Sequence, residues 1–266
     1  MMHRRRLAAA AAACAMGALA LASCTNETGT RDSSRSASKP QAAVVFAAAS
    51  LSEAFPAIAA DVVDGGQDAA TFTFDGSSGL LDQLKAGARA DVYATADTAN
   101  MEAAKEAGLV DDYESYASNR LVLGVPKGNP AGITGLDSSL DGKKLVICAQ
   151  GVPCGNATRK LAERLKVSLK PVSEEQKVTD VRGKVASGEA DAGLMYATDA
   201  AAERDAIDVV EVDGIDDDIN AYEIAVLKDA PHPEAARAFV KAVMSESGQK
   251  ILRDHGFGPP RDADSR

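Results

Sequence analysis

Residues 43–62 read AVVFAAASLSEAFPAIAADV, and this stretch indicates the fold class. Its first five residues are apolar and suit a buried strand. From Leu51 to Val62, apolar side chains recur at helical spacing, and Ser50 or Ser52 suits the N-cap of that helix. A buried strand followed directly by an amphipathic helix is the repeating unit of an α/β fold.

The same order of strand and helix continues to the end of the chain. Strands are expected at 71–74, 91–94, 121–125, 145–148, 193–196, 208–212 and 221–227. Helices are expected from Leu80, at 98–107, 157–166 and 178–187, from Pro233 and near Glu246. This alternation predicts mostly parallel sheets with helices on both faces.

The chain is predicted to form two lobes, each a mostly parallel sheet flanked by helices. Residues 42–121 and 222–262 would make the first lobe and residues 122–221 the second, so the chain crosses between the lobes twice. Ligands of open α/β sheets bind at the carboxyl ends of strands. The cleft between the lobes is therefore the expected ligand site.

The first residues of the chain precede the predicted fold. Residues 1–23 are typical of a secretory signal, with a basic start and an uncharged apolar run from Leu7 to Leu21. Leu-Ala-Ser-Cys, ending at Cys24, matches a lipobox, so Cys24 is the expected lipidated first residue of the mature protein. An ordinary signal and an uncleaved membrane anchor are the alternatives, although the apolar run is shorter than the roughly 20 residues of a typical span. Residues 24–41 are expected to form a disordered tether.

The charge of the chain excludes several function classes. The 266 residues include 29 Lys plus Arg and 39 Asp plus Glu, which gives a formal net charge of −10. Loss of residues 1–23 would remove three arginines and no acidic residue, leaving −13. A nucleic-acid-binding surface would need a basic face. Aromatic residues make up 4% of the chain and Trp is absent, so a surface that stacks bases or sugars is not expected.

Polar residues follow the predicted strands at the points where helices begin. Ser50 follows the first strand, Ser77 and Ser78 follow the second, and residues 151–156 lead into a helix of the second lobe. The start of a helix offers free backbone N–H groups and the positive end of its dipole. Several such starts in one cleft would bind an anion without a charged side chain. Each serine taken alone also suits an N-cap.

A hydrolase is the competing function class. Gly76-Ser77-Ser78-Gly79 is one residue short of the G-x-S-x-G nucleophile elbow. Beyond the signal segment the histidines are His232 and His255, and no spacing indicates a Ser-His-Asp triad. The sequence has no metal-spaced His, Cys and acidic cluster and no Walker-type phosphate loop. The acidic run at 213–218 is expected to be a solvated loop. The protein is not expected to be an enzyme.

Two cysteines lie close together in the predicted second lobe. Cys148 and Cys154 are six residues apart, at a strand end and a helix start. Outside the membrane a disulfide is the default for such a pair, and free buried thiols are the alternative. A bridge would hold the loop at 152–156 in place.

Short motifs occur in a specific order over residues 43–260. They are Val44–Leu51, Phe74–Ser78, Gly87–Val92, Asp180–Gly183, Gly193–Ala200, and Gly248–Leu252 with Gly256–Phe257. Each motif is modest, but together they resemble the molybdate-binding proteins of ABC importers. The resemblance implies a type II periplasmic-binding-protein fold and a bound tetrahedral oxyanion, molybdate or tungstate.

The resemblance also implies a set of ligand contacts. It places them on the hydroxyls of Ser50, Ser77 and Tyr196 and on the backbone N–H groups of Cys154 and Val181. Many members of the family have alanine where this chain has Cys154, a difference that a main-chain contact tolerates.

The implied protein is an extracytoplasmic receptor, held on the cell membrane by the lipidated Cys24, that delivers its ligand to an ABC permease. It would be a monomer without a cofactor or a nucleic-acid partner, and molybdenum would be present only in the bound oxyanion. Neutral donors suit a fully ionised ligand, whereas a phosphate that keeps a proton would need an acceptor, which Asp75 offers. Receptors for sulfate or phosphate, and an extracytoplasmic hydrolase that uses Ser50 or Ser77, are the alternatives.

Overall fold

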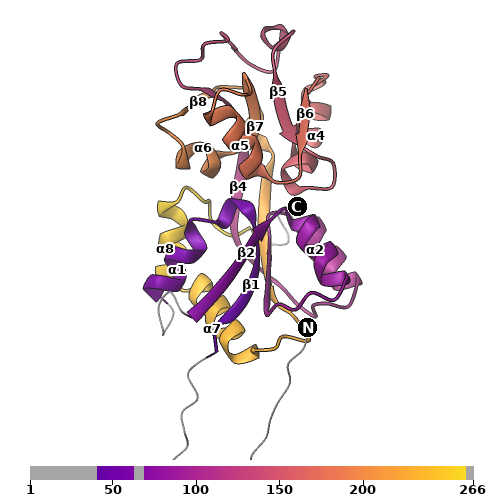
Figure 1. Ribbon diagram of the computed structural model, residues 1–266, viewed down its shortest axis with the longest axis vertical. Helices are drawn as coiled ribbons and strands as arrows, with labels where there is room; N and C mark the ends of the chain where they lie inside the picture. Colours follow the sequence, from indigo (N-terminus) through magenta and orange to yellow (C-terminus); the bar gives the residue numbers. More distant parts are fainter. Residues whose placement is uncertain (1–40, 63–68, 262–266) are drawn as a thin grey trace, which may run out of the picture. The chain divides into compact units, whose positions relative to one another are not determined.

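One long strand, β4 (Glu114–Pro126), belongs to two groups of strands (Figure 1). The structure is a computed structural model that describes residues 41–62 and 69–261. The predicted signal, Cys24 and all but the last residue of the predicted tether lie outside these ranges. Within them, none of the helices combines the length and the apolar character that crossing a membrane requires.

The first half-sheet contains residues 114–120 of β4. Its order is β2-β1-β3-β9-β4, with β1 Ala43–Ala48, β2 Ala70–Asp75, β3 Val92–Thr95 and β9 Ile219–Val226. Strand β1 is parallel to β2 and β3, whereas β9 is antiparallel to β3 and β4. The pairing of β9 with β4 starts at Ile219, opposite Arg120. This half-sheet therefore joins two segments that are far apart in the chain.

The second half-sheet contains the remaining residues of β4. Its order is β4-β7-β5-β6, and β8 also pairs with β4; the bounds are β5 Leu145–Cys148, β6 Ser173–Glu175, β7 Ala192–Tyr196 and β8 Ile207–Val210. Strand β5 is parallel to β6 and β7, and β4 is antiparallel to β7 and β8. The predicted α/β class is confirmed, with antiparallel partners contributed by β4 and β9.

Strand β1 shows why the first half-sheet carries helices on both faces. Val45 and Ala47 are fully buried in one apolar cluster, and Phe46 between them lies in another. Because side chains alternate along a strand, these clusters lie on opposite faces. The first is covered by α1 (Ala54–Val62), α7 (Pro233–Met244) and α8 (Glu246–Asp254), and the second by α2 (Ser77–Lys85) and α3 (Thr98–Glu106).

The second half-sheet is packed against α4 (Pro153–Leu165) and α5 (Val178–Ala186), and α6 (Ala197–Ala202) directly follows β7. Side chains of α5 approach β7 so closely that a Cβ atom at Gly193 would lie 2.7 Å from Val181 Cγ1. Below, each half-sheet together with its helices is called the first or the second half.

The sequence did not indicate strand β6, helix α6 or the first part of β4. Strand β6 is only three residues long, and α6 begins without a polar break after β7. The first part of β4 contains an irregularity between Ser115 and Ala117, which disrupts the strict alternation that a strand would otherwise show.

The expectation of a solvated loop at 213–218 is wrong for its last residue. Asp218 is buried, and its carboxylate accepts a hydrogen bond from Arg164 Nε at 2.7 Å and pairs with Lys160 Nζ at 3.1 Å. Both cations lie on α4, so this acidic run is attached to the second half by ion pairs. Across the described residues, no group of three His, Cys, Asp or Glu side chains is arranged to hold a metal ion.

Candidate functional site

Three of the predicted ligand side chains line one small cavity between the two halves. Ser50 lies in the 3-10 turn η1 (Ala49–Leu51) after β1, Ser77 is the first residue of α2 after β2, and Tyr196 ends β7. Because β1 and β2 are parallel, their carboxyl ends bring the two serines to the same edge. The other lining residues are Ala48, Ala49, Asp75, Gly76, Ala96, Val152, Pro153 and Val178.

Two more helices reach the cavity, but through residues other than the predicted ones. Val152 and Pro153, at the start of α4, and Val178, the first residue of α5, line it. Cys154 and Val181 are buried and are not among the lining residues. Contacts from their backbone N–H groups therefore stay predictions, whereas the two helices that carry them are at the site.

The starts of these helices are not capped by side chains. The N-cap residues of α2, α4 and α5 make no side-chain hydrogen bond to their helices, whereas Asp97 caps α3 and Ser245 caps α8. Helix α7, which does not border the cavity, also lacks such a cap. Within the described residues, no N-cap side chain therefore accepts from the first N–H groups of α2, α4 and α5, and the positive ends of these three helix dipoles lie at the cavity.

The two serines do not have the N-cap role that the sequence also suggested. Ala48 is the N-cap of η1, and the Ser50 hydroxyl instead bonds to the Tyr222 hydroxyl at 2.9 Å. Ser77 is already the first helical residue, and its Oγ accepts a hydrogen bond from the Ala96 backbone N–H at 3.1 Å. Both hydroxyls are therefore held at the cavity.

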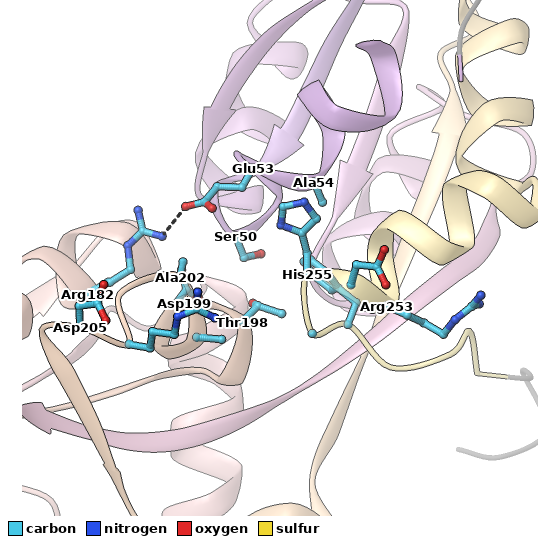
Figure 2. A pocket seen from close by; sticks show the side chains of 15 residues that line it. Ser50, Glu53, Ala54, Arg182, Thr198, Asp199, Ala202, Asp205, Arg253 and His255 are labelled. Carbon is cyan, nitrogen blue, oxygen red and sulfur yellow. Dashed lines mark ion pairs between the residues drawn. The ribbon is translucent and has the colours of Figure 1, made fainter. Parts of the chain in front are cut away.

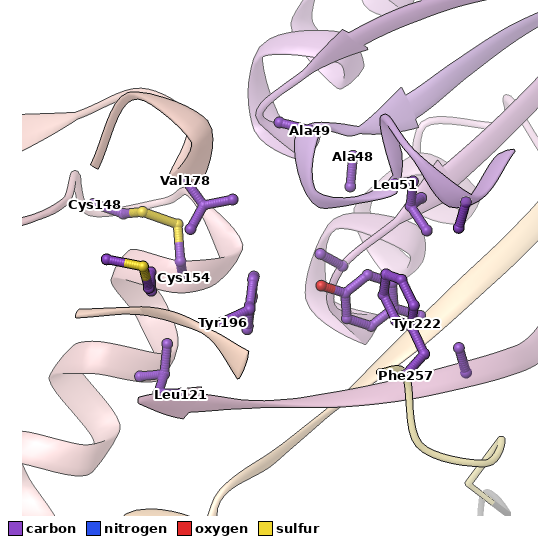
Figure 3. Packing of buried hydrophobic residues seen from close by; sticks show 14 of the residues in the cluster. Ala48, Ala49, Leu51, Leu121, Cys148, Cys154, Val178, Tyr196, Tyr222 and Phe257 are labelled. Atoms are coloured by element: carbon purple, nitrogen blue, oxygen red, sulfur yellow. A yellow bond between two sulfur atoms is a disulfide. The ribbon is translucent and has the colours of Figure 1, made fainter. Parts of the chain in front are cut away.

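Two residues of β9 support the site and were missed by sequence reasoning. Asn220 Nδ2 donates to the Tyr196 hydroxyl at 2.9 Å, and the Tyr222 ring lies 5.9 Å from the Tyr196 ring (Figure 3). Burial raises the pKa of Tyr196 and of Tyr222 above its usual value, so both phenols keep their protons. Nothing in a strand-like stretch such as residues 219–226 distinguishes these two side chains from ordinary packing residues.

A disulfide closes the loop between β5 and α4. Cys148 and Cys154 are joined with their Cα atoms 5.6 Å apart (Figure 3), and the loop they close carries Val152 to the cavity. Next to the bridge, a Cβ atom at Gly155 would lie 1.9 Å from the Ala149 carbonyl oxygen, so only glycine fits there. Covalent bonding and close backbone packing together fix the start of α4.

The two halves approach each other closely beside the cavity. A Cβ atom at Gly76 would lie 2.3 Å from the Gln176 carbonyl oxygen, which belongs to the second half. Asn156 of α4 also donates to Asp97 of the first half at 3.4 Å. The cavity has a volume of about 10 Å³, close to what one water molecule needs.

A larger groove of about 480 Å³ borders Ser50 from another side (Figure 2). Arg182 lies in it, 3.5 Å from Glu53 of the first half and 3.9 Å from Glu203. Burial raises the pKa of Asp199 to about 7, opposed by the Arg182 charge. Acidic side chains line this groove together with the cations. It therefore attracts an anion less strongly than the uncapped helix starts do.

A small cavity between two α/β halves that share a strand, lined by hydroxyls and helix starts, fits a solute-binding protein. A family profile described as bacterial extracellular solute-binding protein matches residues 43–258, and the chain belongs to this family. Its relatives include the molybdate-binding protein ModA of Mycobacterium tuberculosis, which is 42% identical over 220 residues, or 82% of this chain and 84% of the relative.

Two solved structures show the same fold at low sequence identity. The periplasmic molybdate-binding protein of Azotobacter vinelandii matches with a TM-score of 0.70 and 18% identity, over 82% of this chain and 100% of that one. The sulfate-binding protein SubI of Mycobacterium tuberculosis matches with a TM-score of 0.63 and 19% identity, over 82% and 87%.

Proposed function

We propose that this protein captures molybdate or tungstate in the small cavity and delivers it to an ABC permease. The observation that carries the proposal is the convergence of the Ser50, Ser77 and Tyr196 hydroxyls with the uncapped starts of α2, α4 and α5. The 42% identity to a molybdate-binding relative supports the choice of ligand. In this role the protein is a receptor and not an enzyme.

Neutral donors explain how an acidic protein binds a dianion. An oxyanion that enters a cleft loses hydration, and donors must replace its water. The charge of the chain repels anions at long range, but salt screens that repulsion beyond about 10 Å. At contact, hydroxyls and helix starts present positive dipoles without adding a counter-charge.

Binding is proposed to require movement of two lobes, residues 42–121 with 222–262 and residues 122–221. Tyr196 belongs to the second half and the two serines to the first, so neither half alone surrounds the ligand. A cavity of about 10 Å³ admits roughly one water, and a tetrahedral oxyanion is larger. The halves therefore separate to admit the ligand and close on it, with β4 and β9 as the connection.

The receptor is proposed to act outside the cell membrane, as a monomer anchored through lipidated Cys24, which lies outside the described residues. Replacing Cys24 with alanine should move the protein from the membrane fraction to the soluble fraction while leaving oxyanion binding unchanged. A variant that still sediments with membranes would instead indicate an uncleaved apolar segment.

Calorimetric titration with molybdate, tungstate, sulfate and phosphate tests the ligand class. We expect molybdate and tungstate to bind most tightly, and the absence of binding by both would refute the proposal. An ester-turnover screen on the same sample tests the hydrolase alternative. In the described part of the chain neither Ser50 nor Ser77 is hydrogen-bonded to a histidine, and His232 is paired with Asp91, which speaks against that alternative.

A further inference from the structure

A backbone N–H takes one acceptor position of the Ser77 hydroxyl. Ser77 Oγ accepts a hydrogen bond from the Ala96 N–H at 3.1 Å, and a backbone N–H can only donate. Because this bond occupies the oxygen as an acceptor, the single proton of the hydroxyl is left for another partner. Ser77 is fully buried and lines the cavity, where a bound ligand would be that partner.

The Tyr196 hydroxyl is oriented in the same way, across the boundary between the halves. Asn220 Nδ2 donates to the Ala96 carbonyl oxygen at 3.1 Å and to the Tyr196 oxygen at 2.9 Å. Since a carbonyl can only accept, the amide group that faces both atoms is the NH₂ group. The Tyr196 oxygen therefore accepts, and its own proton is free to point elsewhere.

The Ser50 hydroxyl is oriented through Tyr222. Asn119 Oδ1 accepts the Arg120 backbone N–H at 2.9 Å, so the other end of that amide is the donor. Asn119 Nδ2 donates to Thr198 Oγ1 at 2.8 Å and to the Tyr222 oxygen at 3.4 Å. The Ser50 and Tyr222 hydroxyl oxygens are 2.9 Å apart and either could donate; with Tyr222 as the donor, the Ser50 proton is left for a ligand.

We propose that Asn220, and Asn119 acting through Tyr222, are positioning residues that hold the Tyr196 and Ser50 hydroxyls as donors and so restrict the site to oxyanions that carry no proton. The inference rests on the proposed function. Hydrogen phosphate has an O–H group that would meet another O–H donor, whereas sulfate and molybdate present acceptors only. Burial raises the pKa values of Tyr196 and Tyr222, so these donors do not lose their protons.

The first test compares two ions of equal charge and similar size. Sulfate and hydrogen phosphate are titrated, at a pH where phosphate is the dianion, against the wild-type protein loaded with molybdate. The O–H group of hydrogen phosphate would be buried without an acceptor. Sulfate should therefore be the better competitor by roughly ten- to a hundredfold. Equal displacement by the two ions overturns the proposal. In that case Asp75, the acidic residue that lines the cavity, would be the acceptor for the proton of hydrogen phosphate.

The second test reverses the orienting group. In Asn220→Asp the carboxylate can only accept, so the Tyr196 proton turns toward it and away from the ligand. The added charge weakens sulfate and hydrogen phosphate alike, but the preference for sulfate should fall about tenfold. Asn220→Leu is the uncharged comparison: without the donor the Tyr196 hydroxyl is free to accept the phosphate proton, so the preference should also fall, but less than in Asn220→Asp. An unchanged ratio in Asn220→Asp overturns the proposal.

A double-mutant cycle needs only molybdate and cancels the charge of the new aspartate. Tyr196→Phe should weaken molybdate binding by roughly tenfold in the wild-type and Asn220→Leu backgrounds. In the Asn220→Asp background the same change should have little effect, because that hydroxyl no longer donates to the ligand. Equal losses in all backgrounds would show that Asn220 only packs. A wild-type protein that does not bind molybdate at all would refute the proposed function, whereas equal losses leave that function intact.

Discussion

Replacing Gly76 with alanine is expected to weaken molybdate binding while leaving the unliganded fold intact. Gly76 has φ −59°, which alanine adopts readily, so the substitution acts through contact alone. The new methyl group would lie 2.3 Å from the Gln176 carbonyl oxygen and 3.5 Å from Val152 Cγ1. Both belong to the second half, so the methyl group opposes the approach of the two halves.

The magnitude follows from that distance. The methyl group needs roughly 1 Å more room, and because the obstacle is a backbone carbonyl it must be gained by keeping the halves apart. Overpacking by one methyl group typically costs about 1–3 kcal/mol, which corresponds to a dissociation constant roughly 5- to 150-fold higher. In the absence of ligand we expect the halves to relax apart on β4 and β9. Alanine is a poorer N-cap than glycine, which costs about 0.5–1 kcal/mol of stability. It also reduces the entropy of the unfolded chain, which stabilises the folded state by about the same amount, so the two effects offset each other.

Calorimetric titration gives the affinity, and urea unfolding without ligand gives the stability. The matched control is Gly79→Ala in the same helix, where the nearest atom to a new Cβ would be Asp75 Oδ2 at 3.7 Å. That variant should bind like the wild type and gain about 0.5–1 kcal/mol of stability. If Gly76→Ala binds molybdate within about twofold of the wild type, the contact with Gln176 does not form in the bound state and the reasoning is wrong.

Three further predictions concern the site and its surroundings. Ser50→Ala and Ser77→Ala should each weaken molybdate binding by about 1.5–3 kcal/mol, the range for a hydrogen bond to a charged group, and calorimetry that finds both affinities unchanged would contradict the site. Intact mass with alkylation, before and after reduction, should reveal two thiols from Cys148 and Cys154 only after reduction, and replacing both by alanine should lower stability by about 2–3 kcal/mol. The raised pKa of Asp199 means that the folded state holds a proton that the unfolded state releases between pH 3.8 and about 7. The wild type should therefore lose stability relative to Asp199→Asn as the pH rises through that window, by at most about 4 kcal/mol, and parallel stability curves in urea titrations would count against this.

The strands and helices with a simple apolar period could be predicted from the sequence. The run at 43–47 and the spacing after Ser50 both report burial directly, and the structure contains β1 and α1 there. The first part of β4 could not be predicted in this way, because its irregularity near Ser115 shifts the register and its apolar residues do not form a continuous run.

Three of the side chains expected at the site, Ser50, Ser77 and Tyr196, line the cavity, whereas the residues that support them were not anticipated. Ser50 and Ser77 follow parallel strands, so topology alone brings them together. The contacts of Asn220 and Tyr222 depend on how β9 pairs with β3 and β4, which are distant in the chain. The lining of the cavity by Val178 in place of Val181 depends on the angle at which α5 meets it, and spacing along a helix does not encode that angle.

The late position of β9 in the chain affects the order in which the two halves can fold. β3 pairs with β9 through Val92 and Val226, and α7 and α8 cover a face of β1 only after β9 has been added. The strands β5 to β8 lie within one continuous segment, so the second half can fold before the end of the chain is available. Until then the first half exposes an unpaired strand edge and apolar surface, and both features promote aggregation. Because β9, α7 and α8 come last in the chain, we expect this half to be the more prone to aggregation until the chain is complete.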